Sequence, residues 1–174
     1  MSTAVTIRPG ATADAALLAE LGARTFRDTY GAHTDARALE AFVASAFGED
    51  VQRAEIADPA SRYLFAEVAE RAAGFALLRD ERAPVQVTAE HPLHLVRLYV
   101  DRPFQHQGVG KALMRRSLDE AQDQGADAVW LGVWECNPRA IAFYARWDFE
   151  HVAEMPFSFA GNVHRDLLFT RHLT

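Results

Sequence analysis

The chain has 174 residues, of which 49% are hydrophobic and 24% are charged, as is typical of a globular protein large enough for one substantial core. The formal net charge of −6 argues against nucleic acid as a partner and suits a cationic substrate. The single cysteine, Cys136, excludes an internal disulfide framework and a zinc site built from cysteines.

Nothing in the sequence indicates export or insertion into a membrane. No run of about 18 apolar residues could span a bilayer, and the N-terminus lacks the charged and then apolar layout of a signal peptide. No repeat, low-complexity tract or flexible linker divides the chain. We therefore expect one domain, residues 1–174, located in the cytoplasm and without a membrane partner.

The N-terminal part predicts one strand and two helices. The strand covers residues 4–8, and Pro9-Gly10 leads into a helix that we expect Thr12 to cap. Its apolar positions are Ala15, Leu18, Leu21 and Phe26. A second helix begins near Thr34. The connecting segment TFRDTYGAHT, which contains His33, is either a packed helix connection or part of the wall of an acceptor site.

The middle of the chain predicts a hairpin and then a central strand. Residues 62–68 and 73–79 form the two hairpin strands, and a polar loop follows at residues 80–90. The apolar strand at 95–100 then leads through the turn QHQGVGK into an amphipathic helix that ends near Gly125.

The C-terminal part predicts a strand, a helix and two closing strands. Residues 128–134 form an apolar strand buried on both faces, and Asn137 caps a helix that has Pro138 at its first position. The closing strands are residues 149–157 and 163–170, joined through residues 160–162. The strand-helix-strand unit predicts parallel strands and an α/β fold on a mixed sheet.

The turn before the central helix is suited to hold a phosphate group. The N–H groups of a first helical turn are free, and the glycines Gly108 and Gly110 allow a ligand close to the backbone. Two better-known phosphate motifs do not match. The third glycine of a dinucleotide fingerprint is missing, and Ala112 stands where a P-loop requires Ser or Thr.

The sequence Q-x-x-G-x-G, from Gln105 to Gly110, follows a strand that contains LYV and resembles motif A of the GNAT superfamily of acetyl-CoA-dependent N-acetyltransferases. A second block begins at Asn137 and is similar to the GNAT pattern A-x-x-F-Y-x-x-x-G-F. Its matching residues are Ala140, Phe143, Tyr144 and Phe149. Asp148 stands at the glycine position, where Asp tolerates a positive φ better than most residues. The resemblance implies the GNAT fold, with a mixed sheet of about six to seven strands flanked by helices.

Within the superfamily, the sequence looks most like the PaiA-type branch of bacterial enzymes, which is associated with acetylation of spermidine and spermine. TFRDTYGAHT, WLGVWE and the closing FSFAG stretch, followed by Asp166-Leu167-Leu168, carry this resemblance. It implies acetyl transfer to a small-molecule primary amine, with polyamines as the leading class. The alternatives are another amine (an amino acid, an aminoglycoside or a protein N-terminus) and a coenzyme A-binding module without turnover.

The resemblance also implies where acetyl-CoA binds. The turn would cradle the pyrophosphate, the strand edge and Asn137 would contact pantetheine, and Lys111 or Arg102 would add charge. Arg139 and Arg146 are either phosphate contacts or exposed helix charges. The implied contact residues are Leu98, Tyr99, Val100, Gln105, Gln107, Gly108, Val109, Gly110, Lys111, Asn137, Arg139 and Tyr144.

Acetyl transfer to an amine needs a base, a donor to the carbonyl oxygen and an acid for the departing thiolate. The resemblance assigns the donor to a backbone N–H near Val100 and the acid to Tyr144. His94 occupies the slot of a glutamate on the central strand of several GNAT enzymes, which makes it the first candidate base; a structural histidine is the alternative. Glu135 and His33 are weaker candidates.

Direct transfer in a ternary complex is favoured over an acetyl-cysteine intermediate. Cys136 is the only thiol, and no histidine can be assigned beside it. No metal-ligand spacing occurs in the sequence, so we expect no metal. Trp134 and Trp147 suit either a homodimer interface or the core.

Overall fold

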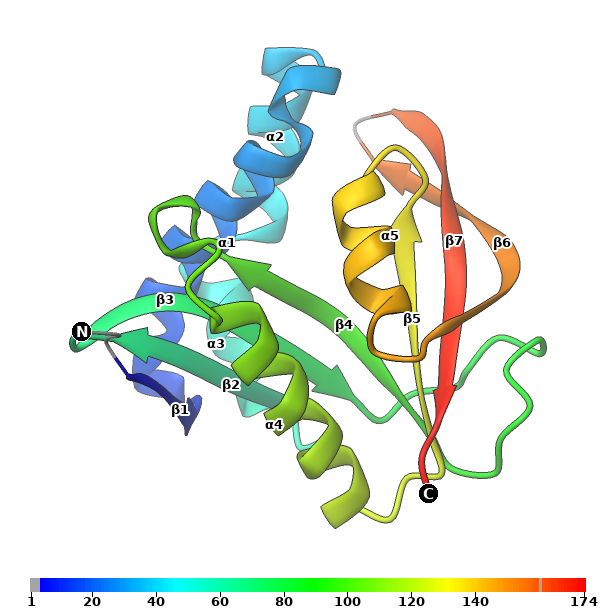
Figure 1. The fold of residues 1–174 in the computed structure, drawn as a ribbon. Helices are drawn as coiled ribbons and strands as arrows, with labels where there is room; N and C mark the ends of the chain where they lie inside the picture. The colour runs from blue at the N-terminus through cyan, green and yellow to red at the C-terminus, as the bar shows by residue number, and fades with distance from the viewer. Residues whose placement is uncertain (1–3, 160) are drawn as a thin grey trace.

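A computed structural model describes residues 4–159 and 161–174, whose seven strands form one mixed sheet in the order β1-β2-β3-β4-β5-β7-β6 (Figure 1). The strands are β1 (Val5–Pro9), β2 (Ser61–Val68), β3 (Arg71–Arg79), β4 (Pro92–Val100), β5 (Ala128–Trp134), β6 (Glu150–Phe159) and β7 (Asn162–His172). The helices are α1 (Ala15–Tyr30), α2 (Ala36–Ala46), α3 (Glu49–Ala57), α4 (Val109–Asp123) and α5 (Pro138–Ala145). The predicted α/β fold is confirmed.

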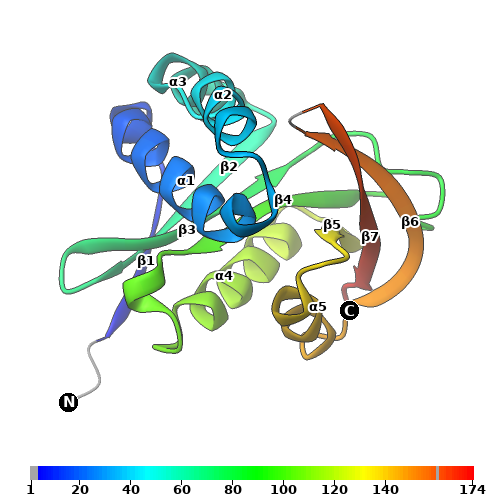
Figure 2. The ribbon, with the colours of Figure 1, turned by 90° about the horizontal axis from the view of Figure 1, so that it is seen from above.

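The helices cover both faces of the sheet. Helices α1, α2 and α3 lie on one face, and α4 and α5 lie on the other (Figure 2). Apolar residues of α4, including Leu113 and Met114, are fully buried in the larger core cluster. Leu18 and Leu21 of α1 pack on Phe65 and other buried residues of the opposite face. Helices α1 and α4 therefore bury their apolar stripes against the sheet.

Strands β4 and β5 are parallel, as predicted, but they pair only over a short stretch. Their register joins residues 92–94 to residues 128–130. Beyond this stretch β4 continues to Val100 beside β3, and β5 continues to Trp134 beside β7. The two strands diverge toward their C-terminal ends (Figure 1). Each of them therefore has a backbone edge there without a strand partner.

A β-bulge in β4 changes the faces to which its side chains point. The register of β4 against β3 shifts so that Val96 is an extra residue. Leu95 and Leu98 consequently both pack in the core cluster on the α4 side, whereas Tyr99 packs on the α1 side. Such a bulge bends the strand and redirects its side chains, and this one lies just before the diverging ends of β4 and β5.

Two predictions for the N-terminal part are wrong, and one helix was not predicted. Thr12 does not cap α1 but begins a short 3₁₀ turn, and the Asp14 carboxylate accepts a hydrogen bond from Ala11 N at 2.9 Å. Helix α1 extends to Tyr30, through most of the expected connection. Helix α3 was not predicted, because only Gln52 of its nine residues is buried and no apolar stripe is present to detect.

The local signals further along the chain are confirmed. Asn137 Oδ1 accepts a hydrogen bond from Ala140 N at 3.1 Å and caps α5. Gly125 follows α4 with φ +75°, and Asp148 follows α5 with φ +60°. Of the expected final connection, Ala160 lies outside the described residues. None of the described helices is long and apolar enough to cross a bilayer.

Candidate active site

The N-terminus of α4 forms an open cradle of backbone N–H groups. Gly108 is its N-cap, with φ +84°, and no side chain caps the helix there. The first intrahelical bond joins Ala112 N to Gly108 O at 2.9 Å, so the N–H groups of Val109, Gly110 and Lys111 precede the hydrogen-bonded ladder. A Cβ on Gly108 would meet no atom within 4 Å. The cradle fits a phosphate group.

The end of β4 directs alternate residues to its two edges. The backbone carbonyl of Tyr99 points to β3, since a Cβ on Gly74 of that strand would lie only 2.5 Å from Tyr99 O. Asp101 N also points to β3, donating to Ala73 O at 2.9 Å. Val100, which lies between them, therefore directs its N–H and C=O toward β5. Of the three residues expected to line this edge, Leu98 and Val100 do so through their backbone, and Tyr99 does not.

Gln105 connects the cradle with α5. Its Nε2 donates to Val100 O at 3.3 Å, and its Oε1 accepts from Arg139 Nη1 at 2.7 Å. Gln107 holds the turn, because its Nε2 donates to Pro103 O at 2.8 Å. The structure thus brings most of the expected acetyl-CoA residues together at one end of the β4–β5 gap. The side chains of Arg102, Lys111 and Arg146 are exposed.

Tyr144 of α5 lies in a group of three tyrosines. Burial raises the pKa of the Tyr144 hydroxyl, and the neighbouring Tyr99 adds to the effect. Burial also raises the pKa of Tyr30, with further contributions from Tyr99, Asp166 and Tyr144. These residues come from α1, β4, α5 and β7, and they are close enough to interact electrostatically. Tyr144 therefore carries its proton at neutral pH.

Aromatic side chains form a wall beside this group. Trp134, at the end of β5, lies with its ring centroid 5.1 Å from Tyr30, 5.3 Å from His33 and 5.8 Å from His164. The Arg24 guanidinium joins α1 to the end of β4 by donating to both carboxylate oxygens of Asp101, at 3.0 and 2.8 Å. The TFRDTYGAHT segment thus reaches the strand ends, an arrangement that favours its interpretation as an acceptor wall.

His94 lies away from this wall. Its ring stacks on Trp130 with 3.6 Å between centroids, and its Nδ1 contacts Glu81 Oε1. Burial lowers the pKa of His94, and Glu81 opposes that effect. Six residues of strand separate His94 from Val100, which corresponds to about 20 Å. His94 therefore lies far along β4 from the Val100 N–H.

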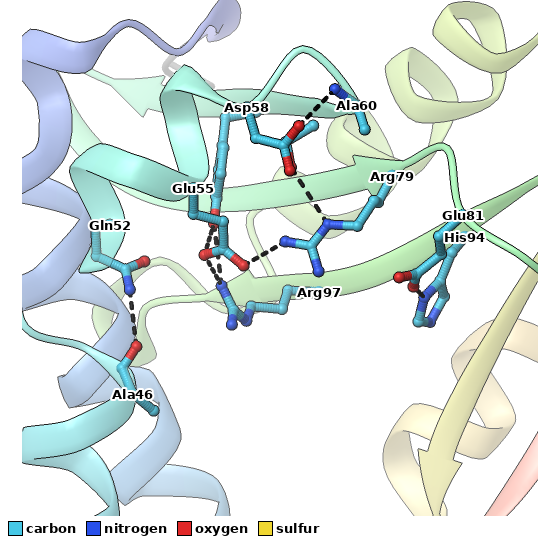
Figure 3. A network of polar contacts seen from close by, with 11 residues as sticks. Ala46, Gln52, Glu55, Asp58, Ala60, Arg79, Glu81, His94 and Arg97 are labelled. Atoms are coloured by element: carbon cyan, nitrogen blue, oxygen red, sulfur yellow. Dashed lines mark hydrogen bonds and ion pairs between the residues drawn. The ribbon is translucent and has the colours of Figure 1, made fainter. Parts of the chain in front are cut away.

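Figure 3 shows that His94 and Glu81 are also separate from the ion-pair network on the neighbouring part of the sheet. There, Glu55 of α3 accepts from Arg97 at 2.8 Å and pairs with Arg79. Burial alone would raise the pKa of Glu55, but Arg97 and the other donors outweigh it and lower that pKa. These charged groups anchor α3 to the sheet.

The other sequence candidates occupy different surroundings. Glu135 accepts from Arg165 Nε at 2.8 Å in an exposed ion pair. Cys136 is an exposed free thiol. Within the described ranges, no group of three or more His, Cys, Asp or Glu side chains is placed to hold a metal ion.

The family profile described as the Acetyltransferase (GNAT) family matches residues 24–149, which include the cradle, both diverging strands and Tyr144. The chain belongs to the GNAT family. This GNAT enzyme is an acetyl-CoA-dependent N-acetyltransferase, and enzymes of the family act on amines of small molecules or proteins. It is 30% identical over 149 residues to an uncharacterised N-acetyltransferase of Lactobacillus delbrueckii subsp. lactis, with 86% of each chain covered.

Two solved structures show the same fold as this acetyltransferase. The PaiA N-acetyltransferase of Thermoplasma acidophilum, solved with coenzyme A, has a TM-score of 0.78 and 18% identity, with 98% of this chain and 99% of that chain covered. The ribosomal-protein-S18-alanine N-acetyltransferase of Escherichia coli has a TM-score of 0.69 and 18% identity, with coverage of 96% and 92%.

The sequence analysis did not name Tyr30 and Asp166 among the candidate site residues of this GNAT enzyme, although the structure places both beside Trp134. The segments that contain them, TFRDTYGAHT and the closing strand, were both singled out by the resemblance. Asp166 also had a local signal, because it alternates with His164 and the buried Leu168 along β7. A carboxylate on the side of a strand that faces other protein elements is uncommon unless it has a partner or a function.

Proposed function

We propose that this GNAT enzyme acetylates a primary amine by direct transfer in a ternary complex, with polyamines as the leading acceptor class. The observation that carries the proposal is the Asp166 carboxylate, which lies close enough to Tyr30 and Tyr99 to affect their pKa values, beside the Trp134 wall. Carboxylates and aromatic faces both attract ammonium groups. The net charge of −6 and the resemblance to the PaiA-type branch support the same substrate class.

The residues around the β4–β5 gap suit acetyl-CoA as the donor. The N–H groups of residues 109–111 would hold the pyrophosphate, with Lys111 adding positive charge. The backbone edge at Leu98 and Val100 would bind the extended pantetheine arm, together with the side-chain NH₂ of Asn137. The Val100 N–H would donate to the thioester oxygen and stabilise the negative charge that develops on it.

Tyr144 would act as the general acid. Its raised pKa keeps the hydroxyl protonated, which is the form that can donate to the departing thiolate. A covalent route through Cys136 is disfavoured, because that thiol is exposed and no histidine can be assigned beside it as a base. Direct attack of the amine on the thioester requires only the groups that meet at the gap.

A peptide or protein N-terminus is the second candidate acceptor. It is supported by the similarity of this chain to the S18-alanine enzyme of Escherichia coli, with 40% identity over 50 residues, or 29% of this chain. An α-amino group has a lower reference pKa than a polyamine ammonium, so it would need less help in losing its proton. Polyamines and peptide N-termini therefore need to be compared as acceptors in one assay.

The proposals about cellular context rest on the sequence. A cytoplasmic location and the lack of nucleic-acid and membrane partners stay predictions. Trp134 is buried, and Trp147 packs against the main core cluster. Both residues thus contribute to packing within the chain, and a homodimer stays a prediction.

Thiol release from acetyl-CoA tests the proposed function. The purified protein would be assayed with spermidine, spermine, several amino acids, an aminoglycoside and an alanine-initiated peptide, beside a Tyr144→Phe variant. We expect a polyamine to give the highest kcat/KM and the variant to lose about 100-fold or more in kcat. Preference for the peptide would replace the polyamine assignment. Coenzyme A binding without turnover on any amine would favour the binding-module alternative.

A further inference from the structure

Buried polar atoms without a hydrogen-bond partner gather on one face of β5 and β7. The described residues contain six such side-chain atoms, and four of them lie on these two strands: Trp130 Nε1, His164 Nε2, Asp166 Oδ1 and Thr170 Oγ1. Trp130 is opposite Thr170 in the register, and Trp134 is opposite Asp166. The period of two in a strand places all four on the same face. Buried polar groups are almost always paired, so this face is suited to a polar ligand.

The neighbouring strand leaves space beside the Asp166 carboxylate. Gly132 is exposed although the other residues of β5 are buried. A Cβ on Gly132 would lie 3.2 Å from Asp166 Oδ2 and 3.7 Å from Met155 Sδ. Any larger residue at position 132 would therefore extend toward the carboxylate. The missing side chain leaves the space beside Asp166 Oδ2 unfilled by Gly132.

No cation in the described part of the chain forms an ion pair with Asp166. The titratable group that acts on the pKa of Asp166 is His164 on its own strand, and Asp166 in turn raises the pKa values of Tyr30 of α1 and Tyr99 of β4. Burial raises the pKa of Asp166 to about 6, and His164 opposes the rise. An ionised carboxylate that is partly buried and unpaired destabilises the folded state, and a bound cation from outside the chain would offset that cost.

We propose that Asp166 binds the ammonium group of the acceptor amine and takes a proton from it. The inference rests on the proposed amine acetylation and names the base of that reaction. The carboxylate belongs to the same group of residues as Tyr144, since both act on Tyr30. His94, the candidate from the sequence, is instead held by Glu81 and Trp130.

Asp166 removes one proton from the ammonium group, and the nitrogen lone pair forms a bond to the thioester carbon. The carbon–sulfur bond then breaks, and sulfur takes the proton of the Tyr144 hydroxyl. The second nitrogen proton restores that hydroxyl through solvent, and Asp166 releases its own proton to water. The net products are the acetamide, the coenzyme A thiol and one proton.

The test compares Asp166→Asn with His94→Gln and with Asp119→Asn, a control with the same chemical change at an exposed position of α4. For each variant, kcat/KM for the best amine of the panel is measured from pH 5 to 9. Calorimetry measures acetyl-CoA binding, and also spermidine binding in the presence of coenzyme A. Asp166→Asn should lower kcat/KM at pH 8 by about 100-fold or more and weaken spermidine binding, while acetyl-CoA binding stays within about twofold. The wild-type pH profile should lose activity below about pH 6, because kcat/KM reports ionisation of the free enzyme.

Several outcomes would overturn the inference, and they can be told apart from failure of the proposed function. If Asp166→Asn keeps kcat/KM within threefold of wild type, or if only His94→Gln loses activity, Asp166 is not the base. Loss of acetyl-CoA binding in Asp166→Asn would also contradict the proposed role. If the wild type uses a different amine but depends on Asp166, the polyamine assignment fails and the inference stands. If the wild type neither binds nor acetylates any amine, both the proposed amine acetylation and the assignment of Asp166 as its base are wrong.

Discussion

The Asp166 carboxylate lies 3.2 Å from the point at which a side chain on Gly132 would begin. Glycine inside a strand often marks a close approach of this kind. We expect Gly132→Ala to push the carboxylate aside and to raise KM for the amine about tenfold. KM for acetyl-CoA should not change, because its proposed contacts lie on β4, α4 and α5 with its N-cap rather than on β5. Steady-state kinetics with each substrate varied in turn would measure both values.

Gly48→Ala is the matched control for this substitution. Gly48 precedes α3 with an ordinary φ of −64°, and a Cβ there would make only normal contacts, the nearest at 3.5 Å. Both variants should stay within about 1 kcal/mol of the wild-type free energy of unfolding. An unchanged amine KM in Gly132→Ala would show that the space beside Asp166 is not used by the acceptor.

A second prediction concerns the phosphate cradle. Gly108 and Gly125 flank α4 with φ values of +84° and +75°, and a Cβ at either position would meet no atom within 4 Å. Alanine at either site should therefore cost a similar free energy, about 1–2 kcal/mol, from the left-handed backbone alone. Only Gly108→Ala should weaken acetyl-CoA binding, by severalfold in calorimetry. Equal effects of both variants on binding would argue against the cradle.

The ion pair between Arg24 and Asp101 gives a third prediction. Asp101 is buried, and Arg24 contacts both of its carboxylate oxygens. Arg24→Ala should lower the free energy of unfolding by about 1–3 kcal/mol, because it leaves a buried carboxylate poorly paired. Since α1 also carries Tyr30, we expect a higher KM for the amine. Chemical denaturation and steady-state kinetics would measure the two effects.

Arg27→Ala serves as the control for Arg24→Ala. Arg27 also makes two hydrogen bonds to one carboxylate, that of Glu40, at 2.7 and 2.8 Å. Both of those side chains are exposed, so the pair should contribute no more than about 0.5 kcal/mol. Similar losses in the two variants would mean that the Arg24 pair is no more than a surface contact.

The sequence predicted those parts of the fold that depend on local signals. The α4 cradle, the Asn137 cap and the positive φ at Asp148 each follow from residues that are adjacent in the chain. Helix α3 could not be predicted in this way, because it has no apolar stripe and is held to the sheet by distant contacts such as that of Glu55 with Arg97, 42 residues further along. Local periodicity carries no information about such a contact.

The candidate site likewise contains residues that local motifs identify and residues that only long-range strand pairing brings into place. Most of the proposed acetyl-CoA residues lie in one strand-turn-helix segment and the others lie at α5, so two local motifs that resemble GNAT patterns identified them. The position of Asp166 opposite Trp134, and beside Gly132, depends on the register between β5 and β7. His94 could be matched to a slot in the sequence, but the partners that hold it, Glu81 and Trp130, appear only in the structure.

The last prediction is that Asp166 lowers the stability of the protein at neutral pH. Its pKa is raised from 3.8 to about 6 by burial, so the folded state binds this proton more tightly than the unfolded state does. The resulting stabilisation is complete below about pH 4 and is lost as the pH rises through 6. At pH 7 the ionised carboxylate is therefore unfavourable in the folded state relative to the unfolded chain.

Asp166→Asn removes this titration while keeping the shape of the side chain. The full shift corresponds to about 3 kcal/mol, and partial exposure of the group reduces the expected gain to about 1–2 kcal/mol at pH 7. The gain should disappear at pH 4, where wild-type Asp166 is protonated. Urea unfolding at both pH values would measure it. Lower stability of the variant at pH 7 would show that Asp166 has a stabilising partner, whereas higher stability with lost turnover is expected of a residue retained for catalysis.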